Sequence, residues 1–316
     1  MNCKYCQSPN VIKWGTYKTD QRYFCNDCKR KFTPNTNLYH MHVPANQVSS
    51  ALSMYYEGMS LNAIRRHFQQ EYDTMPSTAT VYEWVEKYTP IAIKNFRDYH
   101  PSVGDIWVAD ETVLKIGGQK VWFWDIIDKD TRFLLASRVS TTRTTGDAHA
   151  LMEKAYEKAG KAPKIILTDS LGSYLDSVEL TFGSDTEHKQ GRPFTTSAED
   201  STNDIERFHG TLKARTKVMR GLKGIESAIE FTDGWLVHYN YFRPHQSLND
   251  KTPAEVAKID YPIKNWADVT KELSPTTMPA LSKAAGFRDR KPKAKVPQTH
   301  IGRPRSKRIG LPRLSR

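Results

Sequence analysis

Three acidic residues, Asp110, Asp169 and Glu206, occupy positions that favour a role in binding a cation. Asp110 lies among apolar residues in the middle of a predicted strand, where a carboxylate is costly unless it is paired or bound to a metal. Asp169 follows a short apolar strand, at the carboxyl end where α/β sheets place ligands. Glu206 shares one face of a predicted helix with His209 and Lys213. Mg²⁺ prefers oxygen ligands, and two such ions can activate an attacking oxygen and stabilise a leaving oxygen in phosphoryl transfer.

Each of these carboxylates also has an ordinary structural interpretation. Asp169 could cap the following helix, and Glu206 could pair with a basic neighbour on a solvated helix face. Glu111 is a weaker candidate, because alternation along the strand predicts that it points away from the face of Asp110. Asp125, Asp128 and Asp204 are also weaker candidates. Asp128 lies in a predicted turn between two strands, where Asp is common, and Asp204 lies half a helical turn from Glu206.

The elements around these residues predict a mixed α/β domain over residues 100–260. Alternating apolar residues and buried runs predict strands at 105–115, 121–127, 132–139 and 164–168, with a weakly marked strand at 186–189. Apolar residues at helical spacing predict helices at 146–159 and 203–215. Lys213, Arg215 and Lys217 then form a basic run that would offset the repulsion between the carboxylates and a DNA backbone.

The four cysteines predict a metal site at the N-terminus. Cys3, Cys6, Cys25 and Cys28 form two C-x2-C pairs, which is the spacing of a four-thiolate zinc site. About 35 residues cannot bury enough apolar surface to fold alone, and structural zinc supplies that free energy in comparable peptides. We therefore expect a zinc ribbon over residues 1–35. Two disulfides are the alternative, but no feature of the sequence indicates an oxidising compartment.

Residues 44–90 predict three helices. Ser60 and Ser77 are candidate caps for the second and third helices, and Val81, Trp84 and Tyr88 recur at helical spacing on the third. This order resembles a helix-turn-helix whose third helix contacts DNA, although its turn is longer than usual. An ordinary small helical bundle is the alternative.

Charge is distributed unevenly along the 316 residues, which carry a net charge of +12. Residues 276–316 contain 12 Lys and Arg against one acidic residue, whereas the centre of the chain is slightly acidic. We expect this tail to be a disordered basic arm. Its Ile301–Arg305 segment, with Arg303 and Arg305, partly resembles an AT-hook that enters the minor groove. No run of about 18 apolar residues and no apolar leader is present, so a membrane or secreted protein is not expected.

The segments "WVADETVLKIGG", "ILTDSLGSY", "NDIERFHGTLKARTKVMRG" and "HYNYFRPHQSL", followed by "KTPAEV", together resemble the catalytic core of the insertion-sequence DDE transposases. This family belongs to the retroviral-integrase superfamily. The resemblance implies a ribonuclease-H-like fold, with Asp110, Asp169 and Glu206 as catalytic ligands of Mg²⁺ or Mn²⁺. It also implies that Lys213 approaches DNA beside the active site.

The function implied by the resemblance is transposition. The enzyme would bind the terminal inverted repeats of an insertion element, cut the DNA, and join the freed 3′-hydroxyl to target DNA. Pairing of two element ends suggests a homodimer or a larger assembly, in the cytoplasm and on the nucleoid. Two alternatives remain: a non-catalytic DNA-binding regulator, and a ribonuclease-H-like nuclease without strand transfer.

Overall fold

The computed structural model of the chain describes residues 1–3, 6–17, 20–33, 43–169, 171–191, 201–219 and 224–271. The predicted basic tail, including Arg303 and Arg305, lies outside these residues. Within the described ranges, no helix is both long and apolar enough to cross a membrane.

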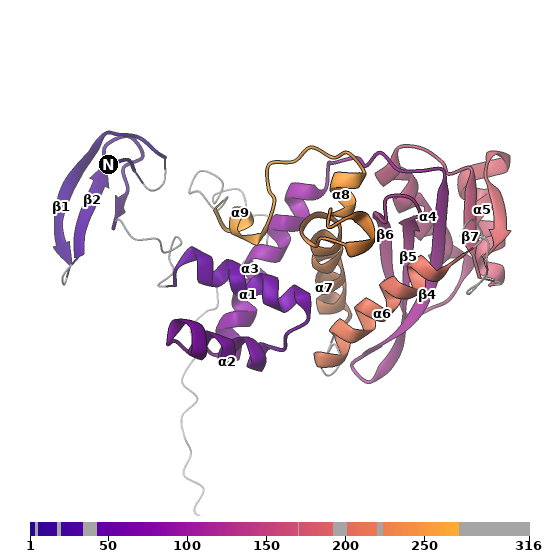
Figure 1. Cartoon of the computed structure of the whole chain (residues 1–316), viewed down its shortest axis with the longest axis horizontal. Helices are drawn as coiled ribbons and strands as arrows, with labels where there is room; N and C mark the ends of the chain where they lie inside the picture. Colours follow the sequence, from indigo (N-terminus) through magenta and orange to yellow (C-terminus); the bar gives the residue numbers. More distant parts are fainter. Residues whose placement is uncertain are drawn as a thin grey trace, which may run out of the picture. The chain divides into compact units, whose positions relative to one another are not determined.

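The N-terminal segment forms a small antiparallel sheet in the order β1-β2-β3 (Figure 1). Its strands are β1 (Val11–Tyr17), β2 (Asp20–Cys25) and β3 (Lys31–Phe32). Buried Cys3 and Cys25 pack with Phe32, so the thiols themselves form much of this small core. Such a core is too small to hold the segment folded without further cross-linking.

Three helices follow, as the apolar spacing predicts: α1 (Ala45–Glu57), α2 (Leu61–Tyr72) and α3 (Thr78–Phe96). The hydroxyls of Ser60 and Ser77 accept backbone N–H groups at the starts of α2 and α3, which confirms both predicted caps. Helix α3 runs beyond the predicted end of the module, because Ile91 and Phe96 are buried on the far side of Pro90. Their burial outweighs the cost of a proline inside the helix.

The central domain contains a mixed five-stranded sheet in the order β6-β5-β4-β7-β8. Its strands are β4 (Ile106–Ile116), β5 (Gln119–Asp128), β6 (Leu134–Ser140), β7 (Ile165–Thr168) and β8 (Glu187–Gln190). Strands β4, β5 and β6 pair antiparallel, whereas β4, β7 and β8 pair parallel. The mixed α/β class and all five predicted strands are therefore confirmed.

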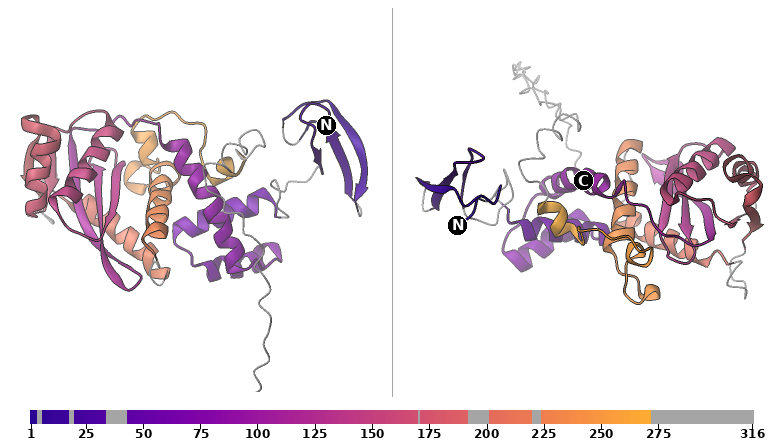
Figure 2. Two further views of the ribbon diagram at one scale, coloured as in Figure 1. Left: turned by 180° about the vertical axis from the view of Figure 1, so that it is seen from behind. Right: turned by 90° about the horizontal axis from the view of Figure 1, so that it is seen from above.

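Helices cover both faces of this sheet (Figures 1 and 2). They are α4 (Thr145–Ala159), α5 (Gly172–Phe182), α6 (Asn203–Val218) and α7 (Ile225–Val237), and α7 continues into a π-helical turn at His238–Phe242. On β5, Trp124 contacts Tyr174 of α5, whereas the next residue, Asp125, contacts His209 of α6. Since successive side chains on a strand point to opposite faces, α5 and α6 lie on opposite sides of the sheet.

Helices α1–α3 share one hydrophobic core with the C-terminal helices of the described chain. These include α8 (Pro253–Val256) and α9 (Trp266–Lys271). The ring of Tyr56 on α1 stacks on Trp266 of α9 and on Phe231 of α7, with centroids 5.0 and 6.3 Å apart. The segment after the sheet therefore returns to pack on the helices that precede it.

Candidate active site

Asp110 and Asp169 come together because their strands are neighbours. Strand β4 pairs in parallel with β7 up to Val108, and β7 ends at Thr168, so Asp169 emerges beside Asp110. Oxygen atoms of Asp110, Asp169 and Glu111 all lie within 4.8 Å of one another. Two of the three predicted carboxylates thus form one acidic cluster with a third residue that the sequence ranked lower.

Glu111 points toward α5, as its strand position predicts, and it still reaches the cluster. The Tyr174 hydroxyl of α5 donates a hydrogen bond of 2.7 Å to Glu111 Oε2. Beyond Val108, β4 has no pairing with β7, so side chains from either face of β4 can approach Asp169 at this edge. Burial raises the pKa of Glu111, and the charge of Asp169 adds to this, against the hydrogen bonds from Tyr174 and Arg143.

Arg143, in the connection between β6 and α4, supplies a positive charge to this cluster. Its guanidinium pairs with Glu111 and lies 3.6 Å from an oxygen of Asp169. The same group stacks over the ring of Trp122, 4.6 Å from its centroid. Arg143 therefore neutralises part of the acidic charge, and it does so from the α5 side of the sheet.

His209 connects Asp110 to a second, fully buried carboxylate. Its Nε2 lies 2.8 Å from Asp125 Oδ2, and its Nδ1 lies 3.4 Å from Asp110 Oδ2. Burial opposes the imidazolium, but the charge of Asp125 and hydrogen bonds to both carboxylates outweigh burial and raise the pKa of His209. The two carboxylates therefore favour the protonated form of His209, which contacts Asp110 from the α6 side of the sheet.

From the sequence, Asp125 is a weaker candidate ligand and His209 has no predicted role. Two signals could have linked them. Asp125 lies directly opposite Asp110 in the β4–β5 register, and His209 lies three residues after Glu206 on one helix face.

Glu206 lies outside the 4.8 Å cluster of Asp110, Glu111 and Asp169. It is half-buried in the first turn of α6, where the Thr202 hydroxyl approaches its carboxylate at 3.5 Å. Glu206 lies three residues before His209 on the same helix, so Glu206 and His209 share a face about one turn apart. His209 in turn contacts Asp110.

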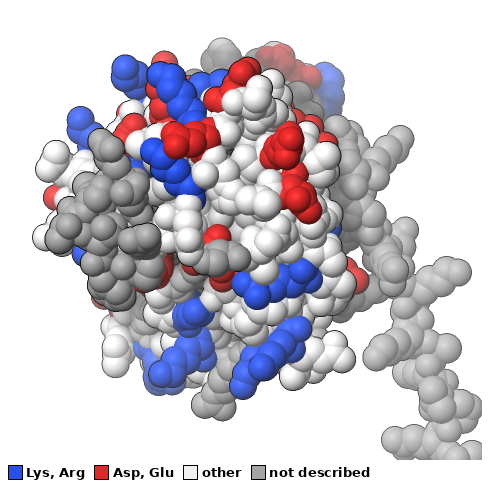
Figure 3. All heavy atoms as spheres, turned by 90° about the vertical axis from the view of Figure 1, so that its right-hand side faces the viewer, with Lys and Arg blue, Asp and Glu red and all other residues white. Residues whose placement is uncertain are grey.

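The predicted basic run on α6 divides into exposed and buried members. Lys213 and Lys217 are exposed, whereas Arg215 is only 3% exposed. Its guanidinium lies over the rings of Tyr55 and Phe231, 4.3 and 5.3 Å from their centroids. The face in Figure 3 shows basic side chains gathered in its lower part, whereas acidic and basic side chains alternate in its upper part.

The four cysteines converge at the N-terminal sheet. One sulfur from each lies within 4.8 Å of the others, and the Cys3–Cys28 and Cys6–Cys25 sulfurs are 3.6 and 3.5 Å apart. These separations exceed the length of a disulfide bond, about 2.05 Å. Backbone N–H groups, foremost that of Cys28, lower the pKa of Cys25 to about 6, which favours the thiolate. The donor set and its compact geometry fit a tetrahedral zinc ion.

Comparison with known proteins gives a match to a protein family. The family model is described as a DDE domain, and it matches residues 104–245. A protein of the transposable element ISH50 from Halobacterium salinarum is 33% identical over 86 residues. That match covers 27% of this chain and 28% of the relative, so the chain aligns with less than a third of the relative's length.

Solved structures of integrase catalytic core domains are among those that match. The HTLV-2 integrase catalytic core domain in complex with magnesium has a TM-score of 0.38 and 15% identity, covering 50% of this chain and 97% of that one. The catalytic core domain of BIV integrase has a TM-score of 0.37 and 17% identity, covering 49% and 94%. The family match identifies residues 104–245 as a DDE domain, and the acidic cluster of Asp110, Glu111 and Asp169 lies within this segment.

Proposed function

We propose that this protein is a DNA transposase that binds the ends of an insertion element, cleaves DNA, and transfers the freed 3′-hydroxyl to target DNA. The observation that carries the proposal is the approach of Asp110 to Asp169 at the end of β7, inside the segment that matches the DDE domain. Arg143 and His209 offset part of the repulsion between these acidic side chains, and a divalent cation bound between Asp110 and Asp169 would offset more of it.

The cluster has the donor chemistry that suits Mg²⁺ or Mn²⁺. Its ligand atoms are carboxylate oxygens, which hard divalent ions prefer. We propose Asp110, Asp169 and Glu206 as the ligands, and we assign Glu111 to the ion pair with Arg143. A pair of bound ions would supply activation of the attacking oxygen and stabilisation of the leaving oxygen.

The surrounding side chains hold the cluster and the DNA in place. His209 fixes the Asp110 carboxylate from the α6 side, while Asp125 fixes the imidazole. Lys213 is exposed on α6, seven residues after Glu206, and we propose that it binds a phosphate next to the cleaved bond. Lys217 extends the same basic surface by one further turn.

The remaining segments suit the recognition of element ends. We propose that residues 1–35 bind zinc through Cys3, Cys6, Cys25 and Cys28, and that the helices within 44–90 contact the terminal repeats. The basic tail at 276–316, with Arg303 and Arg305, would add sequence-independent contacts to phosphates. Because two ends must be brought together, we propose a homodimer or larger assembly that acts on nucleoid DNA in the cytoplasm.

The test is a reaction of the full chain with DNA carrying the ends of its element and Mg²⁺ or Mn²⁺. Joined products are expected. Cut products without joining would indicate a nuclease, and a gel shift without any product would indicate a regulator. Retention of full activity by Asp110→Asn and Asp169→Asn would contradict the assignment of the acidic cluster.

A further inference from the structure

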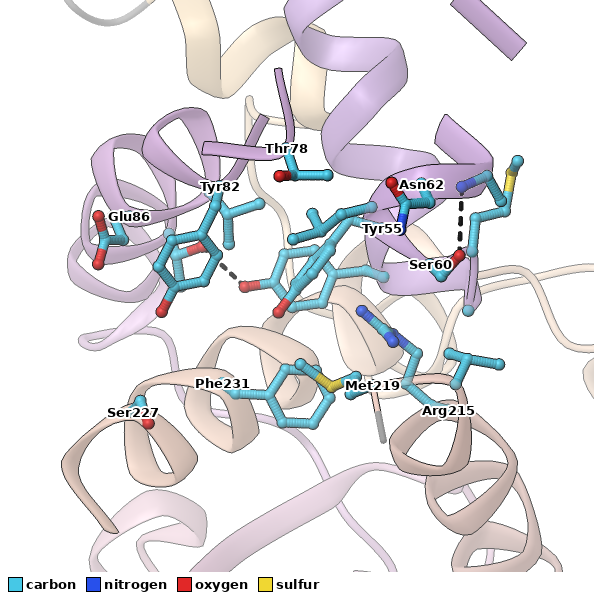
Figure 4. Close-up of a pocket in the computed structure, with 18 of the residues that line it drawn as sticks. Tyr55, Ser60, Asn62, Thr78, Tyr82, Glu86, Arg215, Met219, Ser227 and Phe231 are labelled. Atoms are coloured by element: carbon cyan, nitrogen blue, oxygen red, sulfur yellow. Dashed lines mark hydrogen bonds between the residues drawn. The ribbon is translucent and has the colours of Figure 1, made fainter. Parts of the chain in front are cut away.

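A second site is suggested by a cavity of about 990 Å³ between the N-terminal helices and the C-terminal half of α6 (Figure 4). It is lined by the end of α1, by the start of α2, by one side of α3, by the end of α6 and by α7. None of the acidic-cluster residues lines it. The cavity contains a mixture of aromatic and polar side chains, so its lining is suited to a ligand that has a polar group.

The side chain of Arg215 forms part of the wall of this cavity, and most of its hydrogen-bonding capacity is unused. Its three guanidinium nitrogens are buried and have no hydrogen-bond partner among the described residues. The ring of Tyr55 lies 4.3 Å from the guanidinium, and the Tyr55 hydroxyl also interacts with the guanidinium, but this contact lacks good hydrogen-bond geometry. Stacking on aromatic faces leaves the in-plane N–H groups of an arginine directed outward, where they match the oxygens of a phosphate.

Two helix starts converge on the same cavity. Ser60 and Asn62, at the start of α2, line it together with Thr78, the first residue of α3. The first turn of a helix presents backbone N–H groups and a partial positive charge, which attract anions. Neither first turn contains an acidic residue that would neutralise this charge.

The charges in the wall are separated. Arg66 and Lys217 also line the cavity, and in Figure 4 Arg215 lies on the same side of the view as Asn62 and Ser60. Gly58, two residues before Ser60, lies beside Arg215, since a Cβ atom there would be 3.7 Å from Arg215 Cδ. The acidic residues of the wall are Glu86 and Glu230: Glu86 lies at the opposite side of the same view, with Ser227, and Glu230 lies within electrostatic reach of Glu86. The half of the cavity that contains Arg215 and the start of α2 is therefore positively polarised.

We propose that this half of the cavity binds a phosphate group. The phosphate would accept N–H groups from Arg215 and from the first turn of α2, beside the aromatic rings of Tyr55 and Phe231. Its source is either a phosphodiester of bound DNA or a small phosphate compound. The DNA source rests on the proposed transposase function, whereas the binding of phosphate itself does not.

The test uses Asn62→Asp, because Asn62 is exposed and a carboxylate at a helix start stabilises the helix while it repels an anion. Gln70→Glu is the matched control, since it adds the same charge to an exposed position near the other end of α2. Arg215→Gln is the second variant. Thermal unfolding of the full chain is measured with inorganic phosphate and with chloride at equal ionic strength, and DNA affinity is measured by fluorescence anisotropy with a labelled duplex.

We expect phosphate to raise the unfolding temperature of the wild type and of Gln70→Glu, and to bind about tenfold more weakly to Asn62→Asp. If DNA affinity falls in parallel and phosphate competes with DNA, the source is the DNA backbone. If phosphate stabilisation is lost in Asn62→Asp while DNA affinity matches the control, the source is a small phosphate compound. Equal responses of Asn62→Asp and Gln70→Glu to both ligands would overturn the proposal, whether or not Arg215→Gln folds. Catalysis by the acidic cluster is assayed separately, so a failure of the transposase proposal is distinguishable.

Discussion

The imidazole Nε2 of His209 lies 2.8 Å from the carboxylate of Asp125, whose side chain is fully buried between β5 and α6. The other ring nitrogen faces Asp110, so one buried ion pair supports a residue of the acidic cluster. Because Asp125 has no access to water, its charge depends on His209.

His209→Ala is expected to lower the free energy of unfolding by about 3–5 kcal/mol, because it leaves the Asp125 charge buried without a partner. Adding Asp125→Asn to this variant is expected to restore part of the loss, since a neutral amide costs less to bury. Urea unfolding of the wild type, both single variants and the double variant measures the coupling. Strictly additive losses would show that the two side chains do not form an energetic pair.

The third carboxylate of the active site can be identified by comparing Glu206→Gln with Glu111→Gln. We expect Glu206→Gln to lower the single-turnover rate of DNA nicking by about 10²–10³-fold or more, as Asp110→Asn and Asp169→Asn would. Glu111→Gln is expected to stay within about tenfold of the wild type, because Arg143 already neutralises Glu111. DNA affinity of each variant serves as the control. The reverse order of activities would make Glu111, which lies in the 4.8 Å cluster, the ligand in place of Glu206.

The N-terminal sheet is expected to depend on zinc. Cys25→Ser should release the metal and unfold residues 1–33, because thiolate ligation supplies about 10–16 kcal/mol in comparable zinc peptides. The measurements are metal content by mass spectrometry and the rate of tryptic cleavage within the sheet. Residues 43–271 should keep their resistance to protease, since the N-terminal sheet has a separate core. A chelator that leaves cleavage of the sheet unchanged would contradict a structural zinc ion.

Asp147 is expected to contribute to the loss of stability at acidic pH. It is buried at the start of α4, where burial would raise its pKa, but hydrogen bonds from Thr142, Ser140 and Thr144 outweigh burial and hold the pKa well below its usual range. A depressed folded-state pKa contributes stability above the unfolded value of about 3.9, and this contribution is lost as pH falls through the folded-state pKa.

Asp147→Asn is therefore expected to lower the free energy of unfolding at neutral pH by about 1–3 kcal/mol. The variant should also lose less stability than the wild type between neutral pH and strongly acidic pH. Chemical unfolding at a series of pH values checks both effects, with the exposed Asp176→Asn on α5 as the control. If the free energy of unfolding of Asp147→Asn depended on pH in the same way as that of the wild type, the Asp147 carboxylate would not contribute to the pH dependence.

Deletion of residues 276–316 is expected to reduce the salt dependence of DNA binding. If six or more of the tail's charges contact phosphates, the full chain should lose affinity by about 10³–10⁵-fold between 50 and 200 mM salt. The truncated chain should show a shallower slope and still nick DNA in a metal-dependent reaction. An unchanged slope, or loss of nicking, would contradict this division between tail and catalytic domain.

Local pattern was enough to predict most elements, whereas long-range packing decided the details of the site. Alternation of apolar residues located β4 and β5, and Ser60 and Ser77 were recognised as caps from their types and positions. The approach of Glu111 to Asp169 was missed because it depends on where β7 ends, which strand alternation does not encode.

The burial of Arg215 was missed for a similar reason. It occurs within a run of basic residues, two of which, Lys213 and Lys217, are exposed as such a run predicts. Its aromatic neighbour Tyr55 lies 160 positions earlier in the chain, and no local signal connects the two. Stacking on rings made a charged side chain part of the interior.

Helix α6 extends without interruption from Asn203 to Val218, so it reaches from His209, which contacts Asp110 of the acidic cluster, to the cavity at Arg215. With a rise of about 1.5 Å per residue, the Cα atoms of Glu206 and Arg215 are about 13.5 Å apart along its axis. The helix therefore fixes the spacing between Glu206 and the cavity at Arg215. Insertion of a single residue between Glu206 and Arg215 would rotate one end of the helix relative to the other by about 100°. This segment is therefore expected to tolerate substitutions better than insertions or deletions.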